Sequence, residues 1–176
     1  MNHFTELILK RRSIREYNTE EKISHSVIKQ IMETALMAPT SKNSQAWQFI
    51  LIEDKMMLKN ISACKSHGAA FISKCNLAVI VLIDPLCSEA HIEDATIAAT
   101  YIQLQSENLN LGSCWVHIRE RKTTNNYDSE QYIKDLLNIP SHLCVECIIS
   151  IGNKIKEIKH HKKMEIQWEK VHNGKW

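Results

Sequence analysis

The stretch "NLAVIVLID", from Asn76 to Asp84, decides how the middle of this chain is interpreted. Residues Leu77 to Ile83 are all apolar, and Asp84-Pro85 follows them directly. A short apolar run closed by such a pair predicts a β-strand. The run is also far too short to span a bilayer as a helix. A strand of a water-soluble fold is therefore expected at this position.

The segments on either side predict a mixture of strands and helices. Three further strands are expected from "WQFILIE", "SCWVHI" and "LCVECIISI". Apolar spacing of three and four residues predicts four helices, over residues 4–10, from the Ser24 cap to about 37, from 89 to about 108, and over 129–137. Small residues mark the third of these as central and buried: Ala95, Ala98, Ala99 and Thr100. Without strict βαβ alternation, the fold class is α+β.

Length and composition favour one domain covering residues 1–176. The net charge of +2 gives no general attraction to nucleic acid or to a membrane surface. No signal peptide is visible, so we expect a cytoplasmic protein. The tail from about residue 152 keeps apolar side chains but has no core pattern of its own. It is expected either to pack on a second subunit or to be a frayed end.

The six cysteines are interpreted as reduced core residues of an intracellular protein. The pair Cys144 and Cys147, with His160 beyond it, has the spacing of the first three ligands of a zinc finger. However, positions three apart in a strand face opposite ways, so we expect no metal site.

Several kinds of site are excluded by missing motifs. Four glycines, at positions 68, 112, 152 and 174, cannot form a dinucleotide fingerprint or a Walker loop. The chain has neither a G-x-S-x-G elbow nor an H-E-x-x-H pair. A Cys/His hydrolase stays open, although nothing in the sequence locates its nucleophile.

Three polar groups remain, and together they suit a flavin mononucleotide. "KRRSIREY", residues 10–17, supplies cations and a hydroxyl for a phosphate; "PTSKNSQ", residues 39–45, supplies neutral polar groups; "HHKK", residues 160–163, supplies further cations. Taken singly, each of these stretches also fits a solvated charge run or an ordinary loop.

In combination and order, these stretches resemble the FMN-dependent nitroreductase family, in particular its short members. "KRRSIREY" is similar to the family's phosphate-binding motif K-R-R-S-x-R-x-F/Y, and "APTSKNSQAWQFI" to its A-P-S-x-x-N-x-Q-P-W-x-F segment. "NLNLGSCWVHIRER" resembles the G-L-G-S-C-W segment, and "IGNKIKE" with "IQWEKVHNGKW" the terminal section. Ala46 stands where proline is usual, and Asn153-Lys154 where an aromatic-Pro pair is common.

The resemblance implies roles for individual residues at the phosphate end of FMN. Arg11 and Arg12 fall in the phosphate motif, Ser13 would add hydrogen bonds, and Arg15 would reach the ribityl chain or the N1/O2 edge of the ring. Arg12 is expected to contribute partly through its backbone. Lys163 would complete the phosphate site, with His161 and Lys162 as alternates.

Further residues are implied at the ring. The partner subunit would supply Pro39, Thr40, Ser41 and Asn43, while Gln45 would either touch FMN or support its loop. The backbone of Val116, His117 and Ile118 would contact N5 and O4, and His67 is a candidate on the pyrimidine side. No catalytic side chain and no metal ligand is nominated.

The resemblance also implies a central, mostly antiparallel sheet flanked by helices, in an intertwined homodimer with a C-terminal extension from about residue 152. The expected activity is ping-pong transfer of hydride from NADH or NADPH through FMN to a nitroaromatic, quinone or related small-molecule acceptor. An alternative is a flavin-binding protein that uses FMN as a store, sensor or substrate, without NAD(P)H reductase activity. A nucleic-acid-binding module is a third class, disfavoured by the near-neutral charge.

Overall fold

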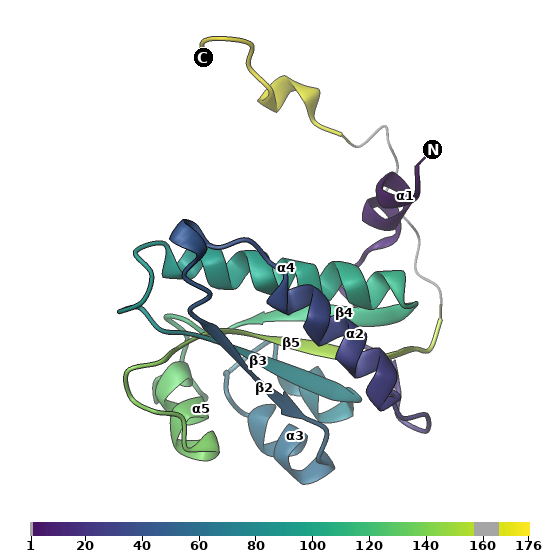
Figure 1. Cartoon of the computed structure of the whole chain (residues 1–176). Coiled ribbons are helices and arrows are strands. Elements are labelled where there is room, and N and C mark those ends of the chain that lie inside the picture. Colours follow the sequence, from purple (N-terminus) through teal and green to yellow (C-terminus); the bar gives the residue numbers. More distant parts are fainter. Residues whose placement is uncertain (1, 157–165) are drawn as a thin grey trace.

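A computed structural model describes residues 2–156 and 166–176 of the chain (Figure 1). Its centre is one five-stranded sheet in which all strand pairs are antiparallel. Strand β5 (Cys144–Lys154) lies between β3 (Leu77–Ile83) and β4 (Leu111–His117). On the far side of β3 lies β2 (Trp47–Ile52), and β1 (Tyr17–Asn18) pairs with the end of β5.

Helices cover both faces of this sheet (Figure 1). On one face lie α2 (His25–Leu36) and α4 (His91–Asn108); on the other lie α3 (Lys55–Ile61) and α5 (Ser129–Leu137). Helix α1 (His3–Lys10) is joined to the end of α4 by a hydrogen bond of 2.9 Å between the His3 ring and the Asn108 side chain. Short 3-10 helices span Ser41–Asn43, Ala70–Lys74 and Trp168–Lys170. The predicted α+β class and mostly antiparallel sheet are confirmed.

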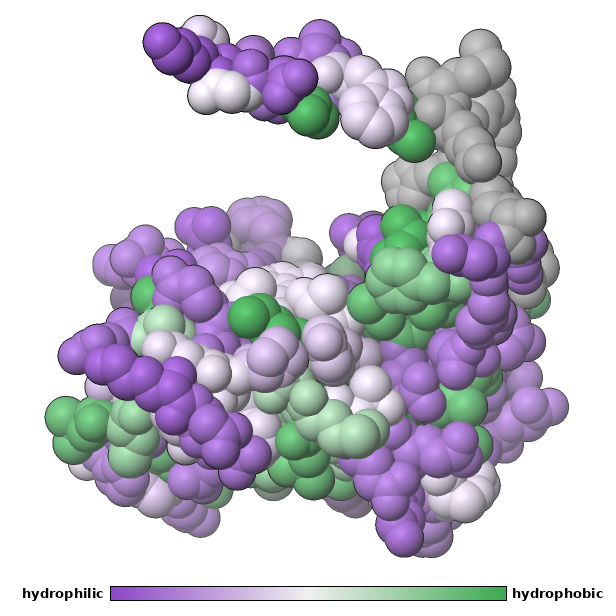
Figure 2. All heavy atoms as spheres, turned by 45° about the horizontal axis from the view of Figure 1, so that its top comes forward, coloured by the Kyte–Doolittle hydropathy of each residue, from purple (hydrophilic) through white to green (hydrophobic). Residues whose placement is uncertain are grey.

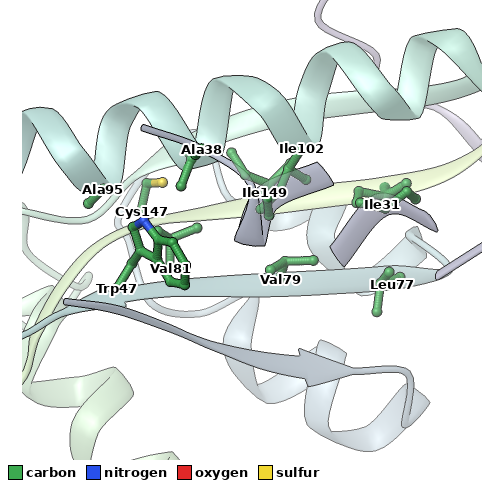
Figure 3. Close-up of a cluster of buried hydrophobic side chains, with 14 of the residues drawn as sticks. Ile31, Ala38, Trp47, Leu77, Val79, Val81, Ala95, Ile102, Cys147 and Ile149 are labelled. Atoms are coloured by element: carbon green, nitrogen blue, oxygen red, sulfur yellow. The ribbon is translucent and has the colours of Figure 1, made fainter. Parts of the chain in front are cut away.

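Strand β3 separates two hydrophobic cores, which explains why it is apolar throughout. Leu77, Val79, Val81 and Ile83 join one buried cluster, part of which Figure 3 shows beneath α4. The alternate residues, Ala78, Ile80 and Leu82, join the cluster on the opposite face. Because side chains of a strand alternate between faces, a strand covered on both sides must be apolar at every position.

Helix α4 lies close to the sheet because its contact face is made of alanine. Ala95, Ala98 and Ala99 are fully buried, as the sequence predicted, whereas the prediction was wrong for Thr100, which is exposed. Near its carboxyl end, Glu107 accepts a hydrogen bond of 2.7 Å from the Lys154 ammonium group, and both side chains are buried. This ion pair ties α4 to the last residue of β5.

A β-bulge corrects the orientation expected for two cysteines. The register of β3 with β5 shifts between Val81 and Leu82, which pair with Cys147 and Val145 and leave Glu146 without a partner on β3. Cys144 and Cys147 consequently pack against the same hydrophobic cluster, although they are three residues apart. Their predicted opposite orientation was wrong, because a bulge changes the alternation of the strand. No group of three potential metal ligands occurs among the described residues, and His160 lies outside them.

The predicted strands and helices agree with the structure to within a few residues. The sequence analysis missed α3, the short β1 and the 3-10 helix Ala70–Lys74. Strand β5 continues to Lys154, so an arm predicted from about residue 152 can begin only after this strand. Within residues 2–156 and 166–176, no helix is long and apolar enough to cross a membrane.

Candidate functional site

The cationic motif lies where the chain leaves α1 and crosses the sheet. Ser13 forms an isolated parallel bridge with Ser113 of β4, and the Ile14 backbone N–H donates to the Ser113 carbonyl over 2.9 Å. Ile14 is buried against the sheet, whereas Ser13 and Arg15 are exposed. The buried residue therefore fixes the segment, and its two polar neighbours face outward.

Two glycines allow this close crossing. A Cβ atom added to Gly112 would lie 2.7 Å from the Ile14 Cβ, which is shorter than any normal contact. A Cβ atom added to Gly152 would lie 2.6 Å from the ring of Tyr17. Only glycine fits where another segment approaches the backbone this closely. The glycine in the "LGSCW" segment thus serves the cationic motif directly.

Arg11, Ser13 and Arg15 converge on the thiol of Cys114. Burial raises the pKa of this thiol, while the charge of Arg15, a hydrogen bond from Ser13 and the charge of Arg11 act in the opposite direction. Two guanidinium groups and a hydroxyl therefore lie near one residue of β4. Such a donor set suits a doubly charged phosphate, which guanidinium groups bind through paired hydrogen bonds.

Arg12 is half-buried and is not among the groups that influence Cys114. Successive side chains of an extended segment point to opposite sides, so Arg12 shares a side with Ile14. The structure therefore brings Arg11, Ser13 and Arg15 to one side of this segment, close to Cys114.

Tyr17 anchors the far end of the crossing segment. Its hydroxyl donates to the Ile14 carbonyl over 2.6 Å and lies 2.8 Å from the Ser150 hydroxyl. Burial raises the pKa of Tyr17 far above its ordinary value. The phenol therefore stays protonated and holds the segment in place.

A cavity of about 570 Å³ adjoins Arg15 and includes residues that the sequence analysis did not single out. The Arg15 guanidinium carbon lies 5.8 Å from the centre of the Phe71 ring, in cation–π contact, and Lys74 lines the same cavity. Phe71 and Lys74 closely follow His67, so the segment already held a candidate. The signal in the sequence that could have identified these two residues is an aromatic side chain and a cationic side chain spaced about one helical turn apart.

The end of β4 carries the next group of predicted residues. Val116 and Ile118 are buried, and His117 between them is half-buried. Burial lowers the pKa of His117, and the charges of Arg121, Arg119 and Lys65 lower it further. The Ser66 backbone N–H donates to the Lys122 carbonyl over 3.0 Å. The loop that carries His67 is thereby attached just beyond this strand end.

The polar loop, residues 39–45, lies elsewhere on the molecule. Pro39, Asn43 and Gln45 are exposed, and Thr40 and Ser41 are half-buried. The Gln45 backbone N–H donates to the Thr40 hydroxyl over 3.1 Å and closes the loop. Figure 1 shows the loop at one end of α4 and α1 at the other. The structure of one chain therefore does not bring this loop to the cationic motif.

Two further observations complete the placement of the predicted residues. His161, Lys162 and Lys163 lie outside the described residues. A larger cavity, of about 1020 Å³, lies between the segment 19–25 and residues 53–55, and it contains none of the predicted site residues. Its lining holds three carboxylates, of Glu20, Glu53 and Asp54, against two lysines, which gives it no preference for an anion.

Comparisons with known proteins agree on one family. The model of the nitroreductase family matches residues 8–75 and 88–153. A solved FMN-dependent nitroreductase from Clostridium difficile R20291 is 39% identical, with a TM-score of 0.93 over 97% of this chain and 98% of that one. A curated Archaeoglobus fulgidus protein, named provisionally as an NADH dehydrogenase/NAD(P)H nitroreductase, is 29% identical over the whole of both chains.

The fold comparison extends to more distant proteins. The structure of B. megaterium NfrA2 has a TM-score of 0.84 at 22% identity, over the whole of this chain and 75% of that one. The predicted nitroreductase-like fold is confirmed, and so is the family resemblance. The chain belongs to the nitroreductase family.

Proposed function

We propose that the protein is a cytoplasmic FMN-dependent oxidoreductase that takes hydride from NADH or NADPH and passes it to a nitroaromatic, quinone or related acceptor. The observation that carries the proposal is the convergence of Arg11, Ser13 and Arg15 on Cys114 of β4. The similar C. difficile protein is described as an FMN-dependent nitroreductase, and the A. fulgidus relative as an NAD(P)H nitroreductase.

The residues at this point of β4 fit the phosphate end of FMN. Arg11 and Ser13 supply a guanidinium group and a hydroxyl, and the Gly112 backbone keeps the segment flat against the strand. Arg15 lies between Cys114 and the cavity that Phe71 and Lys74 line. In this proposal Arg15 binds the ribityl chain or the ring edge, with Lys74 as a second cation.

The protein's own groups bind and orient, while FMN supplies the chemistry of hydride transfer when bound. The raised pKa values of Cys114 and Tyr17 keep the thiol and the phenol neutral, so neither supplies a nucleophile at neutral pH. Positive charge from Arg15 and Lys74 would favour negative charge on the adjacent edge of the ring. We accordingly assign binding roles and no catalytic side chain.

Two copies of the chain are needed for a site that uses the polar loop. The loop lies near Asp94, and α1 is attached at Asn108; these ends of α4 are about 20 Å apart. A loop from one copy and a cationic motif from the other can meet across a dimer interface. This geometry supports a homodimer in which Pro39 to Gln45 reach the partner's flavin.

The C-terminal segment supports the same arrangement. Ile166, Trp168, Val171 and Trp176 are all more than half exposed. Figure 2 shows this segment standing away from the body of the chain. Apolar side chains exposed together in this way mark a surface for a partner. We propose that the segment packs on the second subunit as an arm.

An absorbance spectrum of the purified protein tests the function. The expected result is a yellow protein whose flavin band at about 450 nm, a property of the cofactor, bleaches when NADH or NADPH is added without oxygen. The double variant Arg11→Ala, Arg15→Ala should lose FMN and keep its far-ultraviolet circular dichroism. Protein that does not bind added FMN in a fluorescence titration would overturn the proposal. Binding without bleaching by either nucleotide would favour a flavin store or sensor.

A further inference from the structure

The polar loop, residues 39–45, has an unusual backbone for a segment without glycine. Lys42, Asn43 and Gln45 have φ angles of 52°, 55° and 48°. These are left-handed conformations, which are unfavourable for residues that carry a Cβ atom. Such a conformation persists only where surrounding contacts determine it, and it often marks a functional site.

The main contact between this loop and the body of the chain is Asp94. Its Oδ1 accepts from the Ser41 backbone N–H over 2.8 Å, and its Oδ2 accepts from the Ser44 hydroxyl over 3.2 Å. The two contacted residues enclose Lys42 and Asn43. One carboxylate therefore contacts the chain both before and after these two left-handed residues.

Asp94 is buried, being only 2% exposed, and it is the fourth residue of α4. Besides the two loop donors, its Oδ2 accepts from the Ser88 hydroxyl over 2.6 Å. No ion pair to Asp94 occurs among the residues that the structure describes. The carboxylate is instead stabilised by three donors and by the amino-terminal end of a long helix.

Other contacts of the loop hold it less firmly. Lys42 pairs with Glu89 over 3.1 Å, but both side chains are largely exposed, and exposed ion pairs contribute little. The hydrogen bond from Gln45 to Thr40 and those within the 3-10 turn join loop residues to one another. They shape the loop without attaching it to α4.

We propose that Asp94 is a positioning residue of the flavin site, which fixes the loop 39–45 in the conformation that presents Thr40 and Asn43 to the flavin of the neighbouring copy. This inference rests on the proposed function, because the loop meets FMN only if the protein binds FMN. Asp94 itself acts through the loop and does not touch the cofactor.

Serine variants around Asp94 provide a matched test. Ser44→Ala and Ser88→Ala each remove one hydroxyl from the same carboxylate oxygen, but only Ser44 belongs to the loop. Ser44→Ala is expected to weaken FMN binding about tenfold, which corresponds to the loss of a hydrogen bond to a charged group. The FMN affinity of Ser88→Ala should stay within twofold of that of the unaltered protein. Fluorescence titration of the folded full chain measures both.

Variants of Asp94 itself test the hydrogen bonds. Asp94→Ala removes both loop contacts and should weaken FMN binding more than Ser44→Ala does. Asp94→Asn should retain binding within about threefold, because its amide oxygen can accept from Ser41 while its amide nitrogen donates to the serine hydroxyls. Rescue by asparagine distinguishes positioning by hydrogen bonds from a requirement for the charge.

A second readout does not depend on FMN. Lys42 is exposed, so trypsin can cut the chain after it once the loop is released. Asp94→Ala and Ser44→Ala should speed this cleavage, identified by fragment mass, while Ser88→Ala should not. If FMN affinity and Lys42 cleavage are unchanged in folded Ser44→Ala and Asp94→Ala protein, the inference is wrong. Faster cleavage with unchanged FMN affinity would also overturn it.

The two readouts separate this inference from the proposed function. If the unaltered chain does not bind FMN, the proposed function fails and the flavin role of Asp94 fails with it. The cleavage rates then still decide whether Asp94 holds the loop.

Discussion

Gly112 and Gly152 lie directly opposite each other on β4 and β5, and together they form a strip of sheet without side chains. Ile14 packs over the first glycine and Tyr17 over the second. The cationic segment therefore owes its position to two residues far from it in sequence. Its charges reach β4 because the sheet carries no side chains at the two glycines that the segment crosses.

Gly112→Ala should destabilise the fold and weaken the binding of FMN. The added methyl group would overlap the Ile14 side chain, and such overpacking costs about 1–3 kcal/mol. Urea unfolding measures the stability, and fluorescence titration measures FMN affinity. In a double-mutant cycle, Ile14→Ala should partly relieve the effect of Gly112→Ala. Additive effects of the two substitutions would contradict the contact.

Lys154→Met should be strongly destabilising, by about 3–5 kcal/mol, because it leaves the Glu107 carboxylate buried without its partner. The further change Glu107→Leu should recover most of this loss, since two apolar side chains can replace a buried ion pair. Lys29→Met is the matched control: Lys29 pairs with Glu33 at the surface and should change stability by less than about 1 kcal/mol. Equal effects of the two lysine substitutions would refute the distinction.

Glu146→Gln should stabilise the protein at neutral pH. Burial raises the pKa of Glu146 above its ordinary value, and the Arg119 charge, with Nε 3.4 Å away, opposes this only in part. The folded state then binds its proton more tightly than the unfolded state, so stability from this group falls as pH rises through the folded-state pKa.

The check for Glu146→Gln is a comparison of melting temperatures across pH. The melting temperature of the variant, relative to that of the unaltered protein, should increase between about pH 4 and pH 8, since glutamine does not ionise. Glu33→Gln, at an exposed helix position, serves as the control. A difference that shrinks with rising pH would contradict the sign.

Cys87 should be the fast-reacting thiol of the native protein. It is exposed, whereas Cys64, Cys75, Cys114 and Cys147 are buried, and burial raises the pKa values of Cys64 and Cys75 to about 12. Labelling with a thiol reagent at pH 8 should lose its fast phase in Cys87→Ser. Asp84→Asn should accelerate that phase, because the Asp84 carboxylate raises the pKa of Cys87. Rapid labelling of several cysteines would argue against the packed core.

Much of the fold could be predicted because local patterns determine it. The apolar run Leu77–Ile83, the Ser24 cap and the spacing of apolar residues along α2 each indicate one element. The motif at residues 11–15 was recognisable for a similar reason, since its charged residues are neighbours in sequence. Contacts across the sheet had no such local signal: the β-bulge at Glu146 and the crossing over the glycines depend on strand register.

The residues that the sequence analysis missed also depend on tertiary structure. Asp94 looks like an ordinary acidic residue near a helix start, and only the folded chain brings Ser41, Ser44 and Ser88 around it. Lys74 is one of many surface lysines until the cavity next to Arg15 identifies it. Conversely, Thr100 shares the small size of its alanine neighbours but lies on the exposed side of the helix.

The pairing of β1 with β5 also determines when this site can form during synthesis. Tyr17 and Asn18 pair with Lys154 and Asn153. The ribosome adds these two residues long after it has added the arginines of the cationic motif. Chains are synthesised from the amino end at about 5–20 residues per second. The nascent chain therefore carries its cationic segment without a docking surface for most of its translation. Under the proposed function, flavin binding would require the finished sheet, and a translation product truncated before β5 would not assemble the proposed site.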